Sequence, residues 1–377
     1  MLVLILKIAT KLNCKRLVFY VLSFLYRGNG YRVFSNRRKA ELYMEGLSPD
    51  LGHSSISHNE IVEEPQYDLQ IVVPVYNTEK YLERCIDSIL SQDTHYSYHI
   101  FIVNDGSTDH SRAILEKYIQ NASVTIIDQK NRGLSGARNR ALRRIEANYI
   151  MFVDSDDILL DDCVEKLLDE AYLGDFELVE GGYQWFDDHG ILNVYDHKIV
   201  EPLSIANLHG QPWAKLYRAS LFQNISFPEG YWFEDTVNLM VLYRKISRFT
   251  IIPQVIYGYR NNAESITNVS KRQYKTIDTY WVTKRLMEDT MTLNLPMNEE
   301  FFELFLKQLI ISGKRIYALN DLKLLAAYVV ASKGLLEEYF KECMVSSTSY
   351  GRMMQSILSH CDYKRMRLAI MFMWDEF

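Results

Sequence analysis

The stretch LQIVVPVYNTEKYLERCIDSIL, residues 69–90, decides the fold of this chain. Its first part, residues 69–75, is mostly apolar, which is typical of a strand that is buried on both faces. Over residues 79–91 the apolar side chains recur at intervals of three and four, which predicts a helix with one buried face. The stretch therefore predicts a strand followed by a helix that covers the sheet.

The same alternation of strands and helices continues along the chain. Apolar runs predict further strands at residues 99–103, 124–128 and 149–153, and a helical pattern covers residues 135–146. Strands that alternate with helices argue for an α/β fold with a mixed, mainly parallel sheet flanked by helices. Ligands of such sheets bind at the carboxyl ends of the strands, so we expect the functional site there.

Three of the predicted strands end in polar residues. The first is followed by Tyr76 and Asn77, the second by Asp105, and the fourth by the acidic motif DSDD, residues 154–157. Parallel strands bring these ends to one edge of the sheet, so we expect the side chains to converge. Taken alone, DGS and DSDD would also serve as ordinary turn or helix-cap sequences.

The acidic motif argues for a bound cation. Asp154, Asp156 and Asp157 are so close in the sequence that their mutual repulsion needs a cation or strong hydrogen-bond donors to offset it. A hard divalent ion held by one or two carboxylates and by substrate phosphates meets that need. The alternative for Asp157 is to cap a helix that we expect to begin near Leu159.

Seven short motifs occur in a fixed order over residues 68–267. They are VVPVYN, VNDGSTD, NRGLSGARNRAL, FVDSDD, PWAKLYR, FPEGYWFEDT and YGYRNNAESIT. The series resembles the family-2 glycosyltransferases with the GT-A fold, of the type that assembles bacterial polysaccharides. The resemblance implies a Rossmann-like sheet and an inverting transfer of a sugar from a nucleotide-diphosphate donor, with a UDP-sugar expected. It also implies Mg²⁺ or Mn²⁺ as cofactor and a glycan or lipid-linked acceptor hydroxyl.

The resemblance also implies the residues of the donor site. The nucleotide-sugar contacts carried over from the family are Pro74, Tyr76, Asn77, Asp105, Arg138, Asp154 and Ser155, and the metal ligands are Asp156 and Asp154. Asp105 can accept a hydrogen bond from a base imide N–H, and Tyr76 offers an aromatic face. Arg138 is expected near the start of a helix, where anions are favoured, and its alternative is a surface charge.

The pair Glu234–Asp235 matches the family's catalytic acids. An inverting transfer needs a base that removes the acceptor proton, and we assign that role to Asp235, with Glu234 orienting the acceptor or Asp235 itself. Two solvated acids at a helix N-terminus are the alternative. Trp213, Lys215 and Arg260 are weaker candidates for the sugar or acceptor site, and core packing is equally consistent with Trp213.

The flanking regions carry no such motif. We expect an extension and linker at residues 1–65, the catalytic domain at 66–270 and a helical region at 271–377. The helical region has helix-like patterns at residues 275–291, 298–315, 321–345 and 350–373. A helical cap, a homo-oligomer contact and an acceptor-side wall are its three alternatives.

The N-terminal segment combines apolar runs with basic residues. Lys7, Lys11 and Lys15 recur every fourth residue, which would stack them on one helix face. Neither apolar run reaches the ~20 residues of a spanning helix, and we expect no signal-peptide cleavage. Peripheral attachment of residues 1–45 to the inner face of the cell membrane is one expectation. Packing as a helical extension on the protein or a partner is the other.

The composition and the motifs argue against several other classes of protein. A formal net charge of -6 gives no general attraction for nucleic acid. The five cysteines are odd in number and widely spaced, so we expect reduced structural thiols and a cytoplasmic protein. A dehydrogenase would need a glycine-rich turn after the first strand, which VVPVYN does not supply. A sugar-phosphate nucleotidyltransferase and a non-catalytic nucleotide-sugar-binding scaffold are the rival hypotheses.

Overall fold

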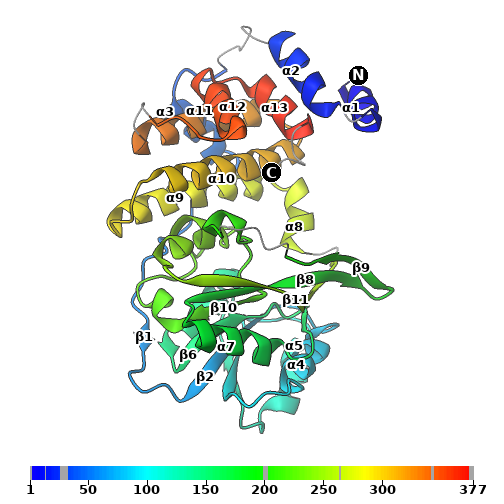
Figure 1. Ribbon diagram of the computed structural model, residues 1–377, viewed down its shortest axis with the longest axis vertical. Helices are drawn as coiled ribbons and strands as arrows, with labels where there is room; N and C mark the ends of the chain where they lie inside the picture. Colours follow the sequence, from blue (N-terminus) through cyan, green and yellow to red (C-terminus); the bar gives the residue numbers. More distant parts are fainter. Residues whose placement is uncertain are drawn as a thin grey trace. The chain divides into compact units, whose positions relative to one another are not determined.

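The computed structural model describes residues 2–12, 14–25, 33–197, 203–262, 265–340 and 344–372, and Figure 1 draws them. Contacts divide the chain into two compact units. One is Gly52–Ser265, and the other combines Met1–Leu51 with Ile266–Phe377. Cys343, for which we expect a reduced thiol, lies outside the described residues, as do residues 341–343 of the helix expected at 321–345 and residue 373 of the one expected at 350–373. The first of these helices ends at Tyr339.

The α/β unit contains one sheet of nine strands among the described residues, which confirms the expected mixed α/β fold. The strand order is β4-β3-β2-β6-β10-β8-β11-β7, with β9 paired to β8. The strands are β2 (Tyr67–Val75), β3 (Tyr98–Asn104), β4 (Val124–Asp128), β6 (Ala147–Phe152), β7 (Ile158–Leu159), β8 (Leu178–Asp187), β9 (Gly190–Tyr195), β10 (Lys215–Arg218) and β11 (Phe249–Arg260). The first four predicted strands are parallel neighbours, whereas β10 runs antiparallel to both β6 and β8.

Strand β2 is buried on both faces because helices cover it from two sides. Its odd-numbered residues, such as Ile71 and Val73, share a hydrophobic core with the apolar stripe of α4 (Leu82–Leu90). On the other side lies α6 (Gly133–Leu142), which also contacts β2. Gln70 fits this apolar strand because its amide donates to the carbonyl of Ala141 at 3.0 Å and accepts from the N–H of Glu146 at 3.1 Å. The remaining helices of the unit are α5 (Ser111–Leu115) and α7 (Cys163–Gly174).

Two helix boundaries differ from the predictions. The helix expected over 135–146 ends at Leu142, because Arg144–Ile145 form the short strand β5, which pairs with β1 (Glu60–Ile61). The helix expected near Leu159 begins at Cys163, because Ile158–Leu159 pair with β11. Both corrections come from pairing with a distant strand, which local periodicity does not encode.

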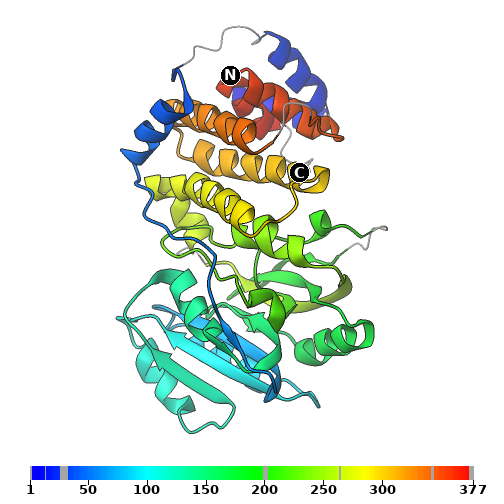
Figure 2. The same ribbon diagram turned by 90° about the vertical axis from the view of Figure 1, so that its left-hand side faces the viewer.

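The segment before β2 is held along its length, although its sequence lacks periodicity. Ser57 and Asn59 donate backbone hydrogen bonds to the carbonyls of Asn224 and Gln223, and the side chain of Asn59 donates to Phe222 at 2.6 Å. Figure 2 shows this blue segment running along the α/β unit. It therefore packs as part of that unit.

The helical unit consists of α1 (Leu2–Lys11), α2 (Lys15–Leu25), α3 (Arg37–Glu45), α8 (Ile266–Val269), α9 (Asp278–Thr292), α10 (Glu299–Ala318), α11 (Leu322–Tyr339), α12 (Ser349–Ser359) and α13 (Tyr363–Phe372). Helices α9 and α10 lie side by side in Figures 1 and 2. The pattern at 350–373 is two helices, because Cys361 adopts a positive φ of 49° between α12 and α13. Helix α3 packs on α11, where Arg37 pairs with Glu338.

The N-terminal lysines do not lie on one helix. Lys7 and Lys11 belong to α1, whereas Lys15 begins α2, so the predicted single face is wrong. Among the described residues, no helix combines the length and apolar character needed to cross a bilayer. Four of the five cysteines are described, and each of them is a free thiol: Cys14, Cys85, Cys163 and Cys361.

Candidate active site

The acidic motif follows β6 directly and is held by residues from β11 and the chain after it. The N–H of Asp154 donates to the hydroxyl of Tyr257 at 3.2 Å, and Asp156 Oδ2 accepts from Asn262 Nδ2 at 2.9 Å. Burial raises the pKa of Asp156, and the charge of Asp154 raises it further, while the amide of Asn262 acts in the opposite direction. The ionised form of Asp156 is therefore disfavoured without a compensating cation.

Asp157 is a buried structural group. It accepts from the hydroxyl of Tyr257 and from the N–H of Arg260, both at 2.7 Å. Burial raises its pKa well above the usual range, and the charge of Asp156 adds to the effect. The helix-cap alternative is wrong, because the next helix begins only at Cys163. Asp157 instead fixes β11 against the acidic motif.

Arg138 connects the acidic motif with the second acidic pair. Its side chain is only 1% exposed, and its guanidinium donates to Asp154 Oδ1 and to Glu234 Oε1, each at 2.7 Å. The alternative of a surface charge is therefore wrong. Phe227 packs over the guanidinium, with the ring centroid 5.1 Å from its carbon. Two motifs 80 residues apart in the sequence (154 to 234) thus meet at one arginine.

Glu234 and Asp235 follow a strained residue. Phe233 has a positive φ of 64°, which is costly for a residue with a large side chain and recurs at functional sites. Glu234 is buried, and burial raises its pKa, although the charge of Arg138 opposes this rise. Asp235 is half-buried, and its charge acts on both Arg138 and Lys215. Glu234 is therefore not one of two solvated acids.

The strand ends expected to bind the nucleoside are hydrogen-bonded to one another. Asp105 is buried and accepts from Gln129 Nε2 at 2.7 Å and from the N–H of Arg132 at 2.8 Å. Burial raises the pKa of Asp105, and these two bonds oppose the rise. Asn77 adopts a positive φ of 53°, and its Oδ1 accepts from the N–H of Thr108 at 2.8 Å.

The remaining donor-site residues surround this arrangement. Pro74 is buried within β2, and Tyr76 is 49% exposed, so its ring is open to a ligand. Ser155 Oγ accepts from Thr78 Oγ1 at 3.1 Å, which ties the end of β2 to the acidic motif. The ends of β2, β3 and β6 are therefore linked, as the sequence predicted for one edge of the sheet.

The three weaker candidates lie inside the protein. Trp213 is 5% exposed and stacks with Tyr257 and Tyr259, each at a centroid distance of 4.9 Å. Lys215 is also buried, and its ammonium lies 3.0 Å from Glu180 Oε2. These positions favour core packing for Trp213 and an internal ion pair for Lys215. The contact of either side chain with a sugar or an acceptor stays a prediction.

Arg260 supports the acidic motif. Its Nε donates to the carbonyl of Asp156 at 3.0 Å, and its guanidinium pairs with Asp188 at 2.7 Å. Its carbon also lies over the ring of Tyr81 at 4.4 Å. Sequence reasoning gave no role to Asn262, although the two asparagines that follow the β11 motif YGYR are a signal of the same kind as the polar residues at the other strand ends.

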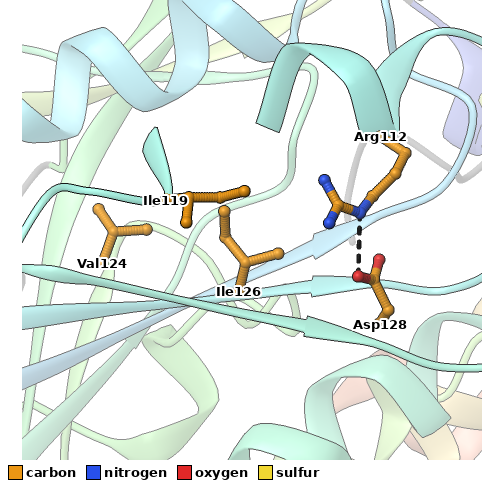
Figure 3. Close-up of a pocket in the computed structure, with 5 residues that line it drawn as sticks. All are labelled: Arg112, Ile119, Val124, Ile126 and Asp128. Carbon is orange, nitrogen blue, oxygen red and sulfur yellow. Dashed lines mark hydrogen bonds and ion pairs between the residues drawn. The ribbon is translucent and has the colours of Figure 1, made fainter. Parts of the chain in front are cut away.

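A pocket lies at the edge strand β4, which is the neighbour of β3 in the sheet. It is lined by Arg112, Ile119, Val124, Ile126 and Asp128, and Figure 3 shows the ion pair of Arg112 with Asp128, at 2.9 Å. It shares no lining residue with the candidate site.

Comparisons with known proteins show the family to which this chain belongs. The sequence model described as glycosyl transferase family 2 matches residues 70–233. GlyG, a glycosyltransferase of Streptococcus pneumoniae serotype 4, is 31% identical over 218 residues, which are 52% of this chain and 72% of GlyG. GlyA of the same organism is 33% identical over 53% of this chain, and EpsJ, an uncharacterized glycosyltransferase of Bacillus subtilis, is 32% identical over 53%.

The likeness covers only part of some of these proteins. The chain spans 32% of the length of GlyA and 63% of EpsJ. The crystal structure of TarS from S. aureus has a similar fold, with a TM-score of 0.60 at 20% identity over 80% of this chain and 54% of that chain. The family match and the identity over most of GlyG show that this chain belongs to glycosyltransferase family 2.

Proposed function

We propose that this chain is an inverting, metal-dependent glycosyltransferase that moves a sugar from a nucleotide-diphosphate donor to an acceptor hydroxyl. We assign the activity to residues 66–270, on which part of the linker packs, with the helical region 271–377 outside the catalytic domain. The observation that supports the proposal most is Arg138, which joins Asp154 of the acidic motif to Glu234 beside the proposed base. Donor and acceptor groups must meet at one place for a transfer, and this arginine links the two motifs.

The donor site would be formed by the strand ends. Asp105 and Tyr76 would hold the base, with Pro74, Asn77 and Ser155 around the nucleoside. UDP is our first choice, and a solved complex of TarS residues 1–349 with UDP-GlcNAc is a precedent in a protein of similar fold. The expected pathway is the assembly of capsule, exopolysaccharide or lipopolysaccharide, with a glycan or lipid-linked acceptor.

The acidic residues fit a divalent cation. Asp156 and Asp154 offer carboxylate oxygens, the ligands that Mg²⁺ and Mn²⁺ prefer, and burial leaves Asp156 in need of a positive neighbour. A bound cation would supply Lewis-acid stabilisation of the leaving diphosphate. Asn262 and Arg260 would keep the loop of the acidic motif in place through Asp156.

Asp235 would act as the general base. It would take the proton of the acceptor hydroxyl while the oxygen attacks the anomeric carbon from the face opposite the nucleotide. Glu234, held by Arg138, would position the backbone turn that carries Asp235. This assignment leaves Arg138 as a positioning residue.

A screen of UDP-, GDP- and dTDP-sugars by thermal shift, followed by a transfer assay with Mn²⁺, tests the proposal. A donor that raises the melting temperature and is consumed in the presence of an acceptor supports it. Donor binding without transfer or hydrolysis across glycan and lipid-linked acceptors would favour the scaffold. Release of pyrophosphate from a nucleoside triphosphate would favour a nucleotidyltransferase.

We also propose that the N-terminal helices bind the surface of an anionic membrane. Helix α2 buries Phe19 but exposes the apolar side chains on its other side: Leu17, Tyr20, Val21, Phe24 and Leu25. Exposed Lys7 and Lys11 on α1 supply positive charge that complements anionic lipid. Such an attachment at the cytoplasmic face would suit a lipid-linked acceptor.

A further inference from the structure

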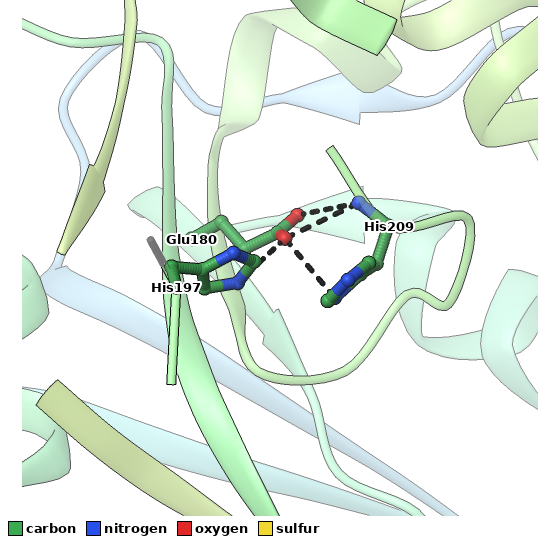
Figure 4. A group of neighbouring side chains, drawn as sticks. All are labelled: Glu180, His197 and His209. Carbon is green, nitrogen blue, oxygen red and sulfur yellow. Dashed lines mark hydrogen bonds and ion pairs between the residues drawn. The ribbon is translucent and has the colours of Figure 1, made fainter. Parts of the chain in front are cut away.

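A second group of potential ligands lies in the α/β unit, on the antiparallel side of the sheet. Glu180 lies on β8, His197 follows β9, and His209 precedes β10. We call these three residues the histidine–glutamate cluster, and Figure 4 shows their side chains turned toward one another. One ligand atom from each residue lies within 4.8 Å of the other two.

The distances within the cluster resemble those around a single ion. Glu180 Oε1 is 2.9 Å from His197 Nε2 and 3.4 Å from His209 Nδ1. Two ligands of a tetrahedral zinc ion, with bonds of about 2.0–2.2 Å, lie roughly 3.3 Å apart. Two of the three separations are therefore near ligand spacing, and the third lies within 4.8 Å.

His197 is the most informative member. Its side chain is only 9% exposed, and Nε2 lies 2.9 Å from Glu180 Oε1, although the two atoms are not aligned for a regular hydrogen bond. The nitrogen and the oxygen are close without pointing at each other. A buried nitrogen usually makes a well-aligned hydrogen bond, whereas two ligand atoms that share an ion lie close together without one.

The second oxygen of Glu180 is already occupied. Lys215 Nζ lies 3.0 Å from Oε2, and the backbone N–H of His209 donates to both carboxylate oxygens at 3.2 Å. Such outer contacts orient a carboxylate that binds a metal through its other oxygen. Tyr183 packs its ring edge-on to His209, with centroids 5.7 Å apart, which adds an apolar wall.

We propose that Glu180 Oε1, His197 Nε2 and His209 Nδ1 bind one transition-metal ion, with Zn²⁺ as the best fit. Imidazole nitrogens suit Zn²⁺, whereas Mg²⁺ prefers oxygen, so this site is chemically distinct from the acidic motif. The ion cross-links β8, the end of β9 and the loop before β10. The positive charge of Lys215 lies beside the site and lowers its affinity, so the ion is exchangeable with chelators.

Titration of the full chain with Co²⁺ tests this proposal, because four-coordinate cobalt absorbs strongly in visible light. We expect a band that saturates at one equivalent and is displaced by Zn²⁺. His197→Ala and His209→Ala lose the band. The matched control His189→Ala, an exposed histidine in the β8–β9 turn, keeps it, and so does Asp156→Asn in the acidic motif.

One further variant gives a positive signature. His209→Cys replaces Nδ1 by a thiolate, so bound cobalt should gain a sulfur-to-metal charge-transfer band in the near ultraviolet. Circular dichroism checks that each variant is folded. The proposal is overturned if the wild-type chain gives no visible band, if both alanine variants keep it, or if folded His209→Cys lacks the new band.

Discussion

Two buried ionic clusters of the α/β unit differ in how their charges balance. The acidic cluster gathers four carboxyl groups, those of Asp154, Asp156, Asp157 and Glu234, and Arg138 pairs with the first and the last of them. Among the described residues, all ion pairs of these four are made by Arg138. In the histidine–glutamate cluster, one carboxylate, Glu180, meets Lys215 and two imidazoles. The first cluster carries surplus negative charge and the second does not.

The difference indicates what each cluster needs. Burial of unpaired carboxylates is costly, so the carboxyl groups of the acidic cluster that Arg138 does not pair favour protonation or an added cation. Burial raises the pKa of Asp156 and that of Glu234 for this reason. Glu180 is more deeply buried than Asp156, but the charge of Lys215 opposes the effect of burial, and the pKa of Glu180 lies below the usual value. The acidic cluster is therefore where we expect hard-cation chemistry, and five variants test the contrast.

The largest effect is expected from Asp235→Asn. The change keeps the shape of the side chain but removes its capacity to accept the acceptor proton, so transfer should fall by ~10²–10⁴-fold or more. Steady-state kinetics with saturating donor measure it. Donor binding should stay near the wild-type value, and near-normal turnover would exclude Asp235 as the base.

The next largest effect is expected on stability from Arg138→Met. It leaves Asp154 and Glu234 without their shared cation, which should cost about 3–5 kcal/mol in the free energy of unfolding. Lys215→Met should lower the free energy of unfolding by less, because the Glu180 carboxylate still has two imidazoles beside it and still accepts from the backbone N–H of His209. Urea denaturation ranks the two.

Arg132→Ala is the matched control for this comparison. The ion pair of Arg132 with Glu229 is partly exposed, so the free energy of unfolding should fall by only ~0–1 kcal/mol. Equal losses for Arg138→Met and Arg132→Ala would contradict the view that the acidic cluster depends on its arginine.

A pH series isolates Asp156. Its pKa is raised in the folded state, so the folded protein binds the proton more tightly, and this contribution is present at low pH. It is lost as the pH rises from the unfolded value of about 3.9 through the higher folded value. Without divalent ions, the unfolding free energy of Asp156→Asn should therefore fall less over this range than that of the wild type. Mn²⁺ should narrow the gap, and a gap unaffected by pH and Mn²⁺ would contradict the assignment.

The smallest effect concerns the other unit of the molecule. Burial of one Phe side chain is worth ~1.5–3 kcal/mol, so Phe24→Glu on α2 should weaken binding to phosphatidylglycerol vesicles by about tenfold or more. Leu173→Glu on α7 is the control, since Leu173 is also exposed. Co-sedimentation measures both, and equal binding by all three proteins would remove the membrane proposal.

Local sequence predicted the parts of the fold that depend on local patterns. The strands β2, β3, β4 and β6 and the strand-end residues around Asp105 and Asp156 follow from apolar runs and the polar residues after them. The register of β7 on β11 and the pairing of β1 with β5 did not follow, because strand pairing is a long-range property.

The burial of charged groups could also not be predicted from the sequence. Arg138 lies in a helix with no marked apolar stripe, so its position toward Asp154 could not be distinguished from a surface position. The meeting of Glu180 with His197 and His209 depends on the β8–β9 hairpin and the loop before β10. None of the three lies in a metal-binding spacing that a sequence search would detect.

The most direct test is to titrate UDP into Asp156→Asn and Asp235→Asn by calorimetry, with and without Mn²⁺. The proposed site predicts that Asp235→Asn retains the Mn²⁺-dependent part of UDP binding, whereas Asp156→Asn loses it. If Asp156→Asn binds UDP with the same gain from Mn²⁺ as the wild type, the acidic motif does not hold the cation.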